Sequence, residues 1–431
     1  MEVLDVITLL ITMAAIFLAV NVKFLKMPTT IGLMILAMVM SVVVIGAGAV
    51  FPGFRAGVTE VMTEYQFADV LFKVMLNFLL FAGALEVNLR TLGEEKLTVF
   101  VLAMFGTLLS TFVVAGATYF VLPLLGLNID FIYCLLFGAL ISPTDPIAVL
   151  AMIKNYQVSK NLQTQISGES LFNDGLGVVV FLTVLAVAKE GTASFDLGET
   201  GMLFVEEVFG GIILGLIIGL VGLWMLKWID NKHTEIEVLI TLSMVMGGSL
   251  LAHMWHFSAP LAMVVMGLTV GREGRDEALA EATGEYVYKF WHLTDEALNA
   301  ILFILIGLQI LLVEWAPKFV LAAIIAIPIV LGARFLGTGT PITILRTKKT
   351  IHRLTVRVLT WGGLRGGISV ALALSLRETL PEVYETERMV IDAIIAMTYS
   401  VVAFSIIVQG LTVGRIFDQI QADEEARNAA A

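Results

Sequence analysis

Long apolar runs, separated by short polar segments, dominate this chain of 431 residues. Each run is about 17–25 residues long, the length that a helix needs to cross a hydrocarbon core of about 30 Å. The runs are continuous rather than alternating, which favours helices over a β-barrel. Only 15% of the residues are charged, against roughly 25% in a soluble domain. The sequence therefore predicts an all-α, polytopic membrane protein.

The apolar runs predict about thirteen transmembrane helices. Their approximate ranges are 4–22, 30–51, 67–89, 97–123, 131–153, 168–188, 204–228, 235–254, 258–271, 287–313, 317–338, 355–378 and 389–417. The polar segments between them are short, so we expect one membrane unit over residues 1–431 and no soluble domain.

The basic residues predict how these helices are oriented. With the N-terminus outside, most of the 26 Lys and Arg residues fall in inner segments, as the positive-inside rule requires. The first apolar run follows the acidic Glu2 and Asp5 and ends at Lys23 and Lys26, the reverse of a secretory signal. We therefore expect an external N-terminus and a cytoplasmic C-terminus. The short loops and tail favour a prokaryotic inner membrane.

The fifth predicted helix is interrupted by Ser142-Pro143-Thr144-Asp145-Pro146. Its two prolines remove backbone donors and clash with the preceding turn. Irregular backbone at membrane depth is tolerated where it lines a cavity or is buried in protein. An ordinary proline kink is the alternative, but a kink does not need Asp145, and a charge at this depth is costly.

The twelfth predicted helix has a second interruption, Trp361-Gly362-Gly363-Leu364-Arg365-Gly366-Gly367. Close helix packing would explain the glycines, but it does not explain Arg365. The fifth and twelfth helices cross in opposite directions, as in inverted-topology repeats whose interrupted helices meet near the midplane. Asp145 and Arg365 can each offset the partial charges of opposed half-helix ends there.

The sixth predicted helix adds two carboxylates, Glu169 and Asp174, to an apolar stretch. Ser170 and Asp174 are four residues apart and share a helix face. An ionisable group at membrane depth indicates a functional site, and oxygen ligands suit a hard cation. With the region of Thr144 and Asp145, this pattern suggests a site that exchanges a small cation for a proton.

Glu169 needs a partner of opposite charge at this depth. Arg334, in the eleventh predicted helix, is the buried cation that fits. We therefore predict a Glu169–Arg334 ion pair with an architectural role.

Taken together, residues 142–146, the stretch Gly168–Gly175 with its Asn173-Asp174 pair, and the stretch Gly362–Gly366 resemble the NhaP-type sodium/proton antiporters. These form the electroneutral branch of the cation–proton antiporter superfamily and are related to the eukaryotic sodium/hydrogen exchangers. The resemblance extends to Leu298–Leu308 in the tenth predicted helix. The combination of motifs is far more specific than any one of them.

The resemblance implies a homodimer whose protomers contain thirteen helices and work by alternating access. Each protomer would have a dimerisation domain, about residues 1–90 plus 204–313, and a mobile ion-transporting core, about residues 97–188 plus 317–417. No cofactor is implied beyond the transported ions, and the expected partners are membrane lipid, a monovalent cation and a second copy of the chain, with no nucleic acid.

The resemblance also assigns site residues. Asp174 would carry either the cation or the proton, and the full ion-binding set would be Asp174, Asp145, Ser170 and Thr144. The supporting residues would be Asn173, Glu169, Arg334 and Arg365. Asn173 stands where electrogenic relatives have a second aspartate, which implies a 1:1 exchange of Na⁺ or Li⁺ for H⁺.

One departure from the family pattern lies in the third predicted helix. Many relatives have Phe-Glu-Gly-Gly there, with the glutamate near the ion through water, whereas this chain has Ala82 in that place. Glu86 and Asn77 are the nearby polar side chains, and the resemblance leaves open whether either compensates.

Other functions fit the sequence less well. A K⁺/H⁺ antiporter on the same scaffold is the nearest alternative, because motifs rarely reveal which cation is carried. A gated cation channel or a non-transporting sensor is an alternative from another class. A channel needs a continuous pore and often a ligand-binding domain, and the sequence shows no sign of either. His253 and His256 could suggest a metal-dependent hydrolase, but they lie beside Trp255 without a clear acidic partner. We therefore expect a transporter and not an enzyme.

Overall fold

The computed structural model describes residues 3–51, 75–153, 158–190, 197–229, 234–273, 283–347, 351, 354–380, 388–419 and 421. The predicted helix at 67–89 begins outside these residues, and several basic residues used to predict the orientation, such as Arg55 and Arg275, also lie outside them. Within the described ranges every regular element is a helix. This confirms the predicted all-α fold.

The helices of the first half of the chain are as follows. They are α1 (Val3–Val20), α2 (Thr29–Val50), α5 (Leu76–Glu86), α6 (Leu89–Val101), α7 (Thr107–Val121), α8 (Phe131–Ile141), α9 (Ile147–Ile153) and α10 (Lys160–Glu190). Short turns of other helix types join some of them: η1 (Asn21–Leu25), η3 (Leu102–Gly106) and η4 (Leu122–Leu125).

The second half of the chain is also helical. Its helices are α11 (Leu197–Trp228), α12 (Thr234–Met254), α13 (Ala259–Glu273), α14 (Thr283–Leu308), α15 (Pro317–Leu345), α16 (Thr355–Trp361), α17 (Gly367–Thr379), α19 (Arg388–Phe404) and α20 (Gly410–Thr412). The connecting turns are η6 (Gln309–Leu311) and η7 (Ser405–Gln409), and η7 is a π-helical turn.

Nine helices in the described part of the chain are long and apolar enough to cross a membrane, and α5, α8 and α13 are shorter apolar helices. The chain is therefore an integral membrane protein. The count of thirteen spans stays a prediction, because the start of the third span lies outside the described residues.

Several helices extend beyond their predicted ends. The helix predicted at 168–188 is α10, which begins at Lys160, and the one predicted at 317–338 is α15, which continues to Leu345. Apolar sequence marks only part of each helix, whereas the helices continue into segments whose side chains are partly buried against protein, such as Gln165 in α10 and Ile342 in α15. Glu169 and Ser170 consequently lie well inside α10 and not at its first turn.

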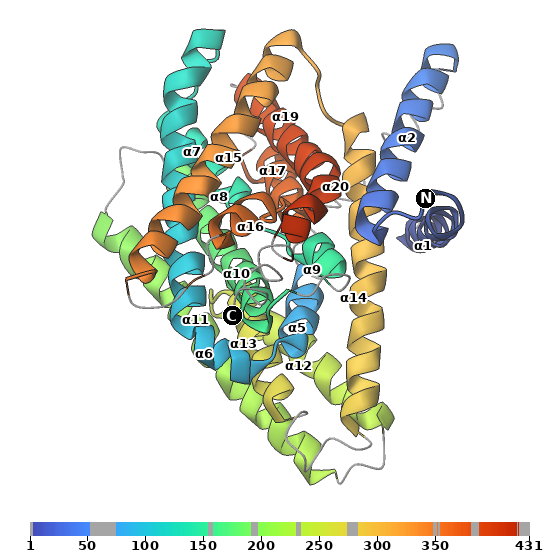
Figure 1. Ribbon diagram of the computed structural model, residues 1–431, viewed down its shortest axis with the longest axis vertical. Coiled ribbons are helices and arrows are strands. Elements are labelled where there is room, and N and C mark those ends of the chain that lie inside the picture. Colours follow the sequence, from blue (N-terminus) through green and yellow to red (C-terminus); the bar gives the residue numbers. More distant parts are fainter. Residues whose placement is uncertain are drawn as a thin grey trace.

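The packing surrounds four short helices with long ones. In Figure 1, α8, α9, α16 and α17 lie near the middle of the molecule. The long helix α15 packs against α7 and α19, and α10 packs against α6 and α8. Elsewhere α13 packs against α5 and α11, and α14 packs against α2 and α5. The four short helices are thereby held in the interior, where their ends need protein partners.

Candidate functional site

Two interrupted helices cross at the centre of the molecule. The segment between α8 and α9 and the segment between α16 and α17 are both extended, and they meet at an antiparallel bridge between Asp145 and Leu364. The Asp145 backbone N–H donates to the Leu364 carbonyl at 2.8 Å. Pro143 and Pro146 have no N–H to contribute to a continuous helix. The predicted interruption of both helices is confirmed.

Arg365 satisfies the carbonyl end of α8. Its guanidinium donates to the carbonyls of Ser142 and Pro143, the latter at 2.9 Å. The C-terminal end of a helix carries partial negative charge, which a buried cation offsets. The Arg365 backbone N–H donates to Ser405 Oγ at 2.9 Å, which fixes the segment that carries the guanidinium.

Asp145 lies at the N-terminal end of a helix, whereas Arg365 lies at a C-terminal end. Its Oδ1 accepts a hydrogen bond from the backbone N–H of Ile147, the first residue of α9, at 2.9 Å. The carboxylate also lies against Gly366, just before α17, where an added Cβ would be 2.6 Å from Oδ2. Asp145 is partly exposed. One carboxylate therefore faces the positive ends of α9 and α17.

Glu169 and Arg334 form a bidentate ion pair. Arg334 donates to the two carboxylate oxygens at 2.6 and 2.7 Å, and its Nε donates to the Leu359 carbonyl at 3.1 Å. Both side chains are at most 3% exposed. The pair predicted from the sequence is present, and it joins α10 to α15 and α16.

Asn173 connects this ion pair to the first interruption. Its Nδ2 donates to Glu169 Oε1 at 3.0 Å and to Thr144 Oγ1 at 2.8 Å, and its Oδ1 accepts from the Thr144 N–H at 3.2 Å. The hydroxyls of Thr144 and Ser170 are 3.1 Å apart. The predicted residues Thr144, Ser170, Asn173 and Glu169 thus belong to one buried hydrogen-bonded network.

Asp174 lies beside this network without joining it. The residue is 9% exposed, and within the described part of the chain its carboxylate has no hydrogen bond to a protein group. The charges of Asp145, Glu169 and Arg365 act on it. A buried carboxylate without a fixed donor is costly unless a proton or a cation joins it, so the arrangement provides a place for one.

Two polar residues that sequence reasoning missed support the second interruption. Ser405 Oγ donates to Gln409 Oε1 at 2.7 Å, and Gln409 Nε2 donates to the carbonyl of Trp361, the last residue of α16, at 2.9 Å. Both lie in the π-turn η7, and such turns are frequent at functional sites. In the sequence, the only indication of this support was that Ser405 and Gln409 are two polar residues, four apart, in an apolar run.

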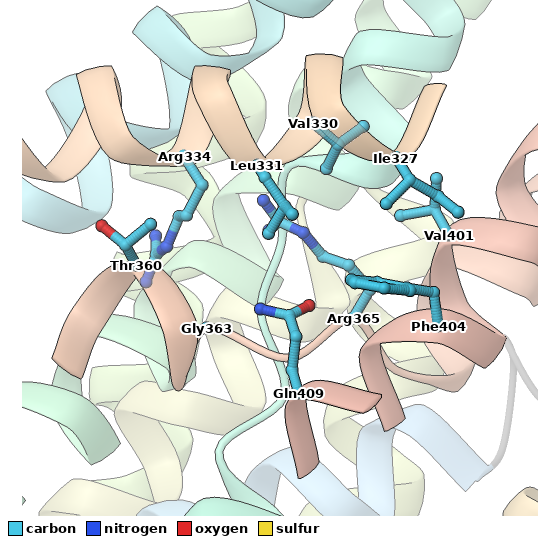
Figure 2. Close-up of a pocket in the computed structure, with 10 residues that line it drawn as sticks. All are labelled: Ile327, Val330, Leu331, Arg334, Thr360, Gly363, Arg365, Val401, Phe404 and Gln409. Carbon is cyan, nitrogen blue, oxygen red and sulfur yellow. The ribbon is translucent and has the colours of Figure 1, made fainter. Parts of the chain in front are cut away.

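Figure 2 shows a small cavity between the two buried arginines. Arg334 and Thr360 lie on one side of it, and Arg365 and Gln409 lie on the other. Its volume of about 10 Å³ is room for a single water molecule at most. The cavity therefore separates the guanidiniums without offering space for a larger ligand.

Ala82, where the chain departs from the family pattern, and the nearby Asn77 and Glu86 lie in different surroundings. Ala82 is buried, and Asn77 Nδ2 donates to Ser249 Oγ on α12 at 2.8 Å. Glu86 lies at the surface and contacts His292 Nδ1 on α14 at 2.9 Å. Asn77 and Glu86 are thus both directed toward other helices.

Comparison with known proteins places this geometry in a family. Residues 9–419 match the family described as "Sodium/hydrogen exchanger, transmembrane". The chain belongs to this family. The match covers the whole of the candidate site, and the predicted resemblance to the NhaP-type antiporters is confirmed.

Individual relatives agree with this membership. The chain is 44% identical over 426 residues to the Na(+)/H(+) antiporter NhaP of Pseudomonas aeruginosa, with 98% of each chain covered. It is 32% identical over 407 residues to the Na(+)/H(+) antiporter NhaH of Halobacillus aidingensis, covering 92% of this chain and 93% of that one. Both relatives are matched over nearly their full length.

A solved structure has the same fold. The sodium proton antiporter MjNhaP1 from Methanocaldococcus jannaschii, at pH 8, superposes with a TM-score of 0.75 at 19% sequence identity. The match covers 96% of this chain and 97% of that one. The crossing of the two interrupted helices therefore lies within a fold that this chain shares with that antiporter.

Proposed function

We propose that this protein is a secondary antiporter that exchanges Na⁺ (or Li⁺) for H⁺, with Asp174 as the residue that carries either ion. The observation that carries the proposal is the Asp174 carboxylate, which is buried beside the crossing and has no hydrogen bond to a described protein group. The names of the relatives as Na⁺/H⁺ antiporters support the choice of ions.

The oxygen atoms near Asp174 suit a small hard cation. Asp145 contributes a partly exposed carboxylate, and Thr144 and Ser170 contribute hydroxyls that are 3.1 Å apart. In the proposal these residues complete the cation site. Asn173 and the Glu169–Arg334 pair hold α10 in register with the first interruption, and Arg365 stabilises the crossing.

The charge of the site supports a 1:1 exchange. Asp145, Glu169 and Asp174 carry three negative charges when ionised, and Arg334 and Arg365 carry two positive charges. One Na⁺ or one H⁺ therefore neutralises the group. An empty, ionised site would be costly to move past a hydrophobic barrier, so the charge balance couples the two ions and limits leak.

Alternating access requires a part that moves against a part that stays. In the proposal the moving part is the core, about residues 97–188 plus 317–417, and the static part is the dimerisation domain, about residues 1–90 plus 204–313. The protein would work as a homodimer in a prokaryotic inner membrane, with its N-terminus outside and its C-terminus in the cytoplasm. The interrupted helices lie within the proposed core, so that the site would move as a unit.

Transport into proteoliposomes tests the proposal. A pH gradient is imposed, and its dissipation is recorded on addition of Na⁺, Li⁺ or K⁺ to wild type and to Asp174→Asn. Dissipation by Na⁺ or Li⁺ that is lost in Asp174→Asn is expected. Asp130→Asn, which changes an exposed aspartate at the start of α8, is the matched control and should behave as wild type.

Other outcomes separate the alternatives. Dissipation by K⁺ alone would favour the K⁺/H⁺ antiporter. Exchange that persists in Asp174→Asn would contradict the role of this carboxylate, and no response to any cation in folded wild type would contradict the exchange itself.

A further inference from the structure

Two side chains of η7 hold the second interruption at both of its ends. At one end, the carbonyl of Trp361 accepts a hydrogen bond from Gln409 Nε2 at 2.9 Å. At the other end, the Arg365 backbone N–H donates to Ser405 Oγ at 2.9 Å. Ser405 Oγ in turn donates to Gln409 Oε1 at 2.7 Å. Ser405 and Gln409, which we call the η7 clamp, therefore join the two ends through one continuous set of hydrogen bonds.

The η7 clamp is deeply buried. Ser405 and Gln409 are 1% and 2% exposed, and Arg365 is 3% exposed. The clamp lies within Arg388–Gln419, a helical stretch long and apolar enough to cross a membrane. An unpaired backbone N–H or carbonyl in such a setting is costly. The second interruption is therefore restricted to the position in which the clamp pairs both of its ends.

The position of the second interruption is passed on to the proposed cation site by two contacts. The Arg365 guanidinium donates to the carbonyls of residues 142 and 143, which directly precede Thr144 and Asp145. The Leu364 carbonyl accepts a hydrogen bond from the Asp145 N–H at 2.8 Å. A shift of the second interruption would therefore displace the oxygen atoms of Thr144 and Asp145.

We propose that Ser405 and Gln409 are positioning residues, which set the geometry of the cation site through Arg365 and the bridge between Asp145 and Leu364. The inference rests on the proposed exchange function. Ion ligands depend on the groups behind them for their orientation, and loss of such support weakens binding of the ion. The η7 clamp would thus determine how tightly Na⁺ is held.

A positioning role and a purely structural role predict different kinetics. Loss of positioning weakens the apparent affinity for Na⁺, while the folded protein still completes the exchange cycle. The KM for Na⁺ then rises, and the maximal rate changes little. A purely structural role would instead lower the unfolding midpoint or the yield of folded protein, and the folded fraction would keep the wild-type KM.

The experiment measures the Na⁺ dependence of exchange in proteoliposomes. Ser405→Ala removes the acceptor of the Arg365 N–H and should raise the KM about fivefold, as for the loss of one buried neutral hydrogen bond. Gln409→Leu keeps a similar volume but removes the amide, and it should raise the KM by a similar factor. It also serves as the test if Ser405→Ala does not fold.

Thr398→Val is the matched control. Thr398 lies in the same helical stretch as the clamp and is 0% exposed. Its hydroxyl donates to the Ile394 carbonyl of its own helix at 2.7 Å. The variant thus removes an equally buried hydroxyl that does not contact the second interruption, and its KM should equal that of wild type.

The double variant tests whether the clamp acts as a unit. Ser405 and Gln409 share the hydrogen bond that joins them, so the effects of Ser405→Ala and Gln409→Leu should not be additive in free energy. The double variant should have a KM close to that of the single variants. Independent effects would instead multiply to about 25-fold and would contradict a shared clamp.

The inference is overturned if folded Ser405→Ala and Gln409→Leu variants keep the wild-type KM. It is also overturned if Thr398→Val raises the KM as much, because the loss of any buried hydroxyl in this helix would then explain the effect. Failure of the exchange function itself is distinguishable, since wild type would then show no Na⁺-driven transport. An active wild type whose KM is unchanged by both substitutions rejects only the positioning role.

Discussion

Asn173 connects the buried ion pair to the interrupted helix, and its amide uses both a donor and an acceptor. Its Nδ2 donates to Glu169 and Thr144, and its Oδ1 accepts from the Thr144 backbone. Asn173→Asp replaces the donor by a second acceptor, 3.0 Å from Glu169. We expect this change to lower the free energy of unfolding by about 2 kcal/mol, measured by thermal unfolding in detergent.

Asn161→Asp provides the matched control for that change. Asn161 lies on the same helix and also donates to a glutamate, Glu95, at 3.4 Å, but Asn161 is exposed. Solvent screens the new charge there, so that the unfolding midpoint should change little. Equal effects of Asn161→Asp and Asn173→Asp, or a stable Asn173→Asp variant, would contradict the role given to the Asn173 donor.

At the level of single residues, it was the charged side chains whose roles could be predicted from the sequence. Glu169 and Arg334 could be paired because few buried charges compete for each other at membrane depth. Ser405 and Gln409 could not be assigned, because a neutral polar residue in an apolar run is compatible with many hydrogen bonds.

At the level of elements, the crossing depends on the close approach of α17 to Asp145. An added Cβ at Gly366 would lie 2.6 Å from Asp145 Oδ2 and 2.7 Å from its Cβ. Gly366→Ala must therefore push the two segments apart. We expect the free energy of unfolding to fall by about 1–3 kcal/mol and Na⁺/H⁺ exchange to be impaired, as measured by thermal unfolding and transport.

Gly332→Ala is the control for this substitution. Gly332 lies within α15, and an added Cβ there meets no atom within 4 Å. Alanine at such a helical position should be neutral or stabilising by about 0.5–1 kcal/mol. A folded, fully active Gly366→Ala variant would show that the close approach is not needed.

The interrupted helices could be predicted because Pro143, Pro146 and the glycines at 362–367 act on the backbone directly. The helix ends were less predictable. The start of α10 at Lys160 lies in polar sequence, where composition no longer reports helix. The π-turn η7 was not predictable either, since its sequence, Ser-Ile-Ile-Val-Gln, is compatible with an ordinary α-helix.

At the level of the whole molecule, the apolar runs and the low charge content were sufficient to predict an all-helical membrane protein. Which helices pack together was beyond the sequence, because lipid-facing and protein-facing surfaces of a membrane helix are similarly apolar. The structure adds the arrangement of the charged residues, because it places five ionisable groups around one crossing. With all five ionised, the group carries one net negative charge.

The central claim is that Na⁺ and H⁺ compete for Asp174, and proton release on binding tests it most directly. Na⁺ is added to purified protein in weakly buffered detergent solution, at a pH where the site is protonated, and the released H⁺ is counted with an indicator dye. Asp174→Asn and the surface control Asp130→Asn are measured alongside. We predict release of about one proton per protomer in wild type and Asp130→Asn, and none in Asp174→Asn. Release that persists in Asp174→Asn, or Na⁺ binding to wild type without release, would contradict the claim.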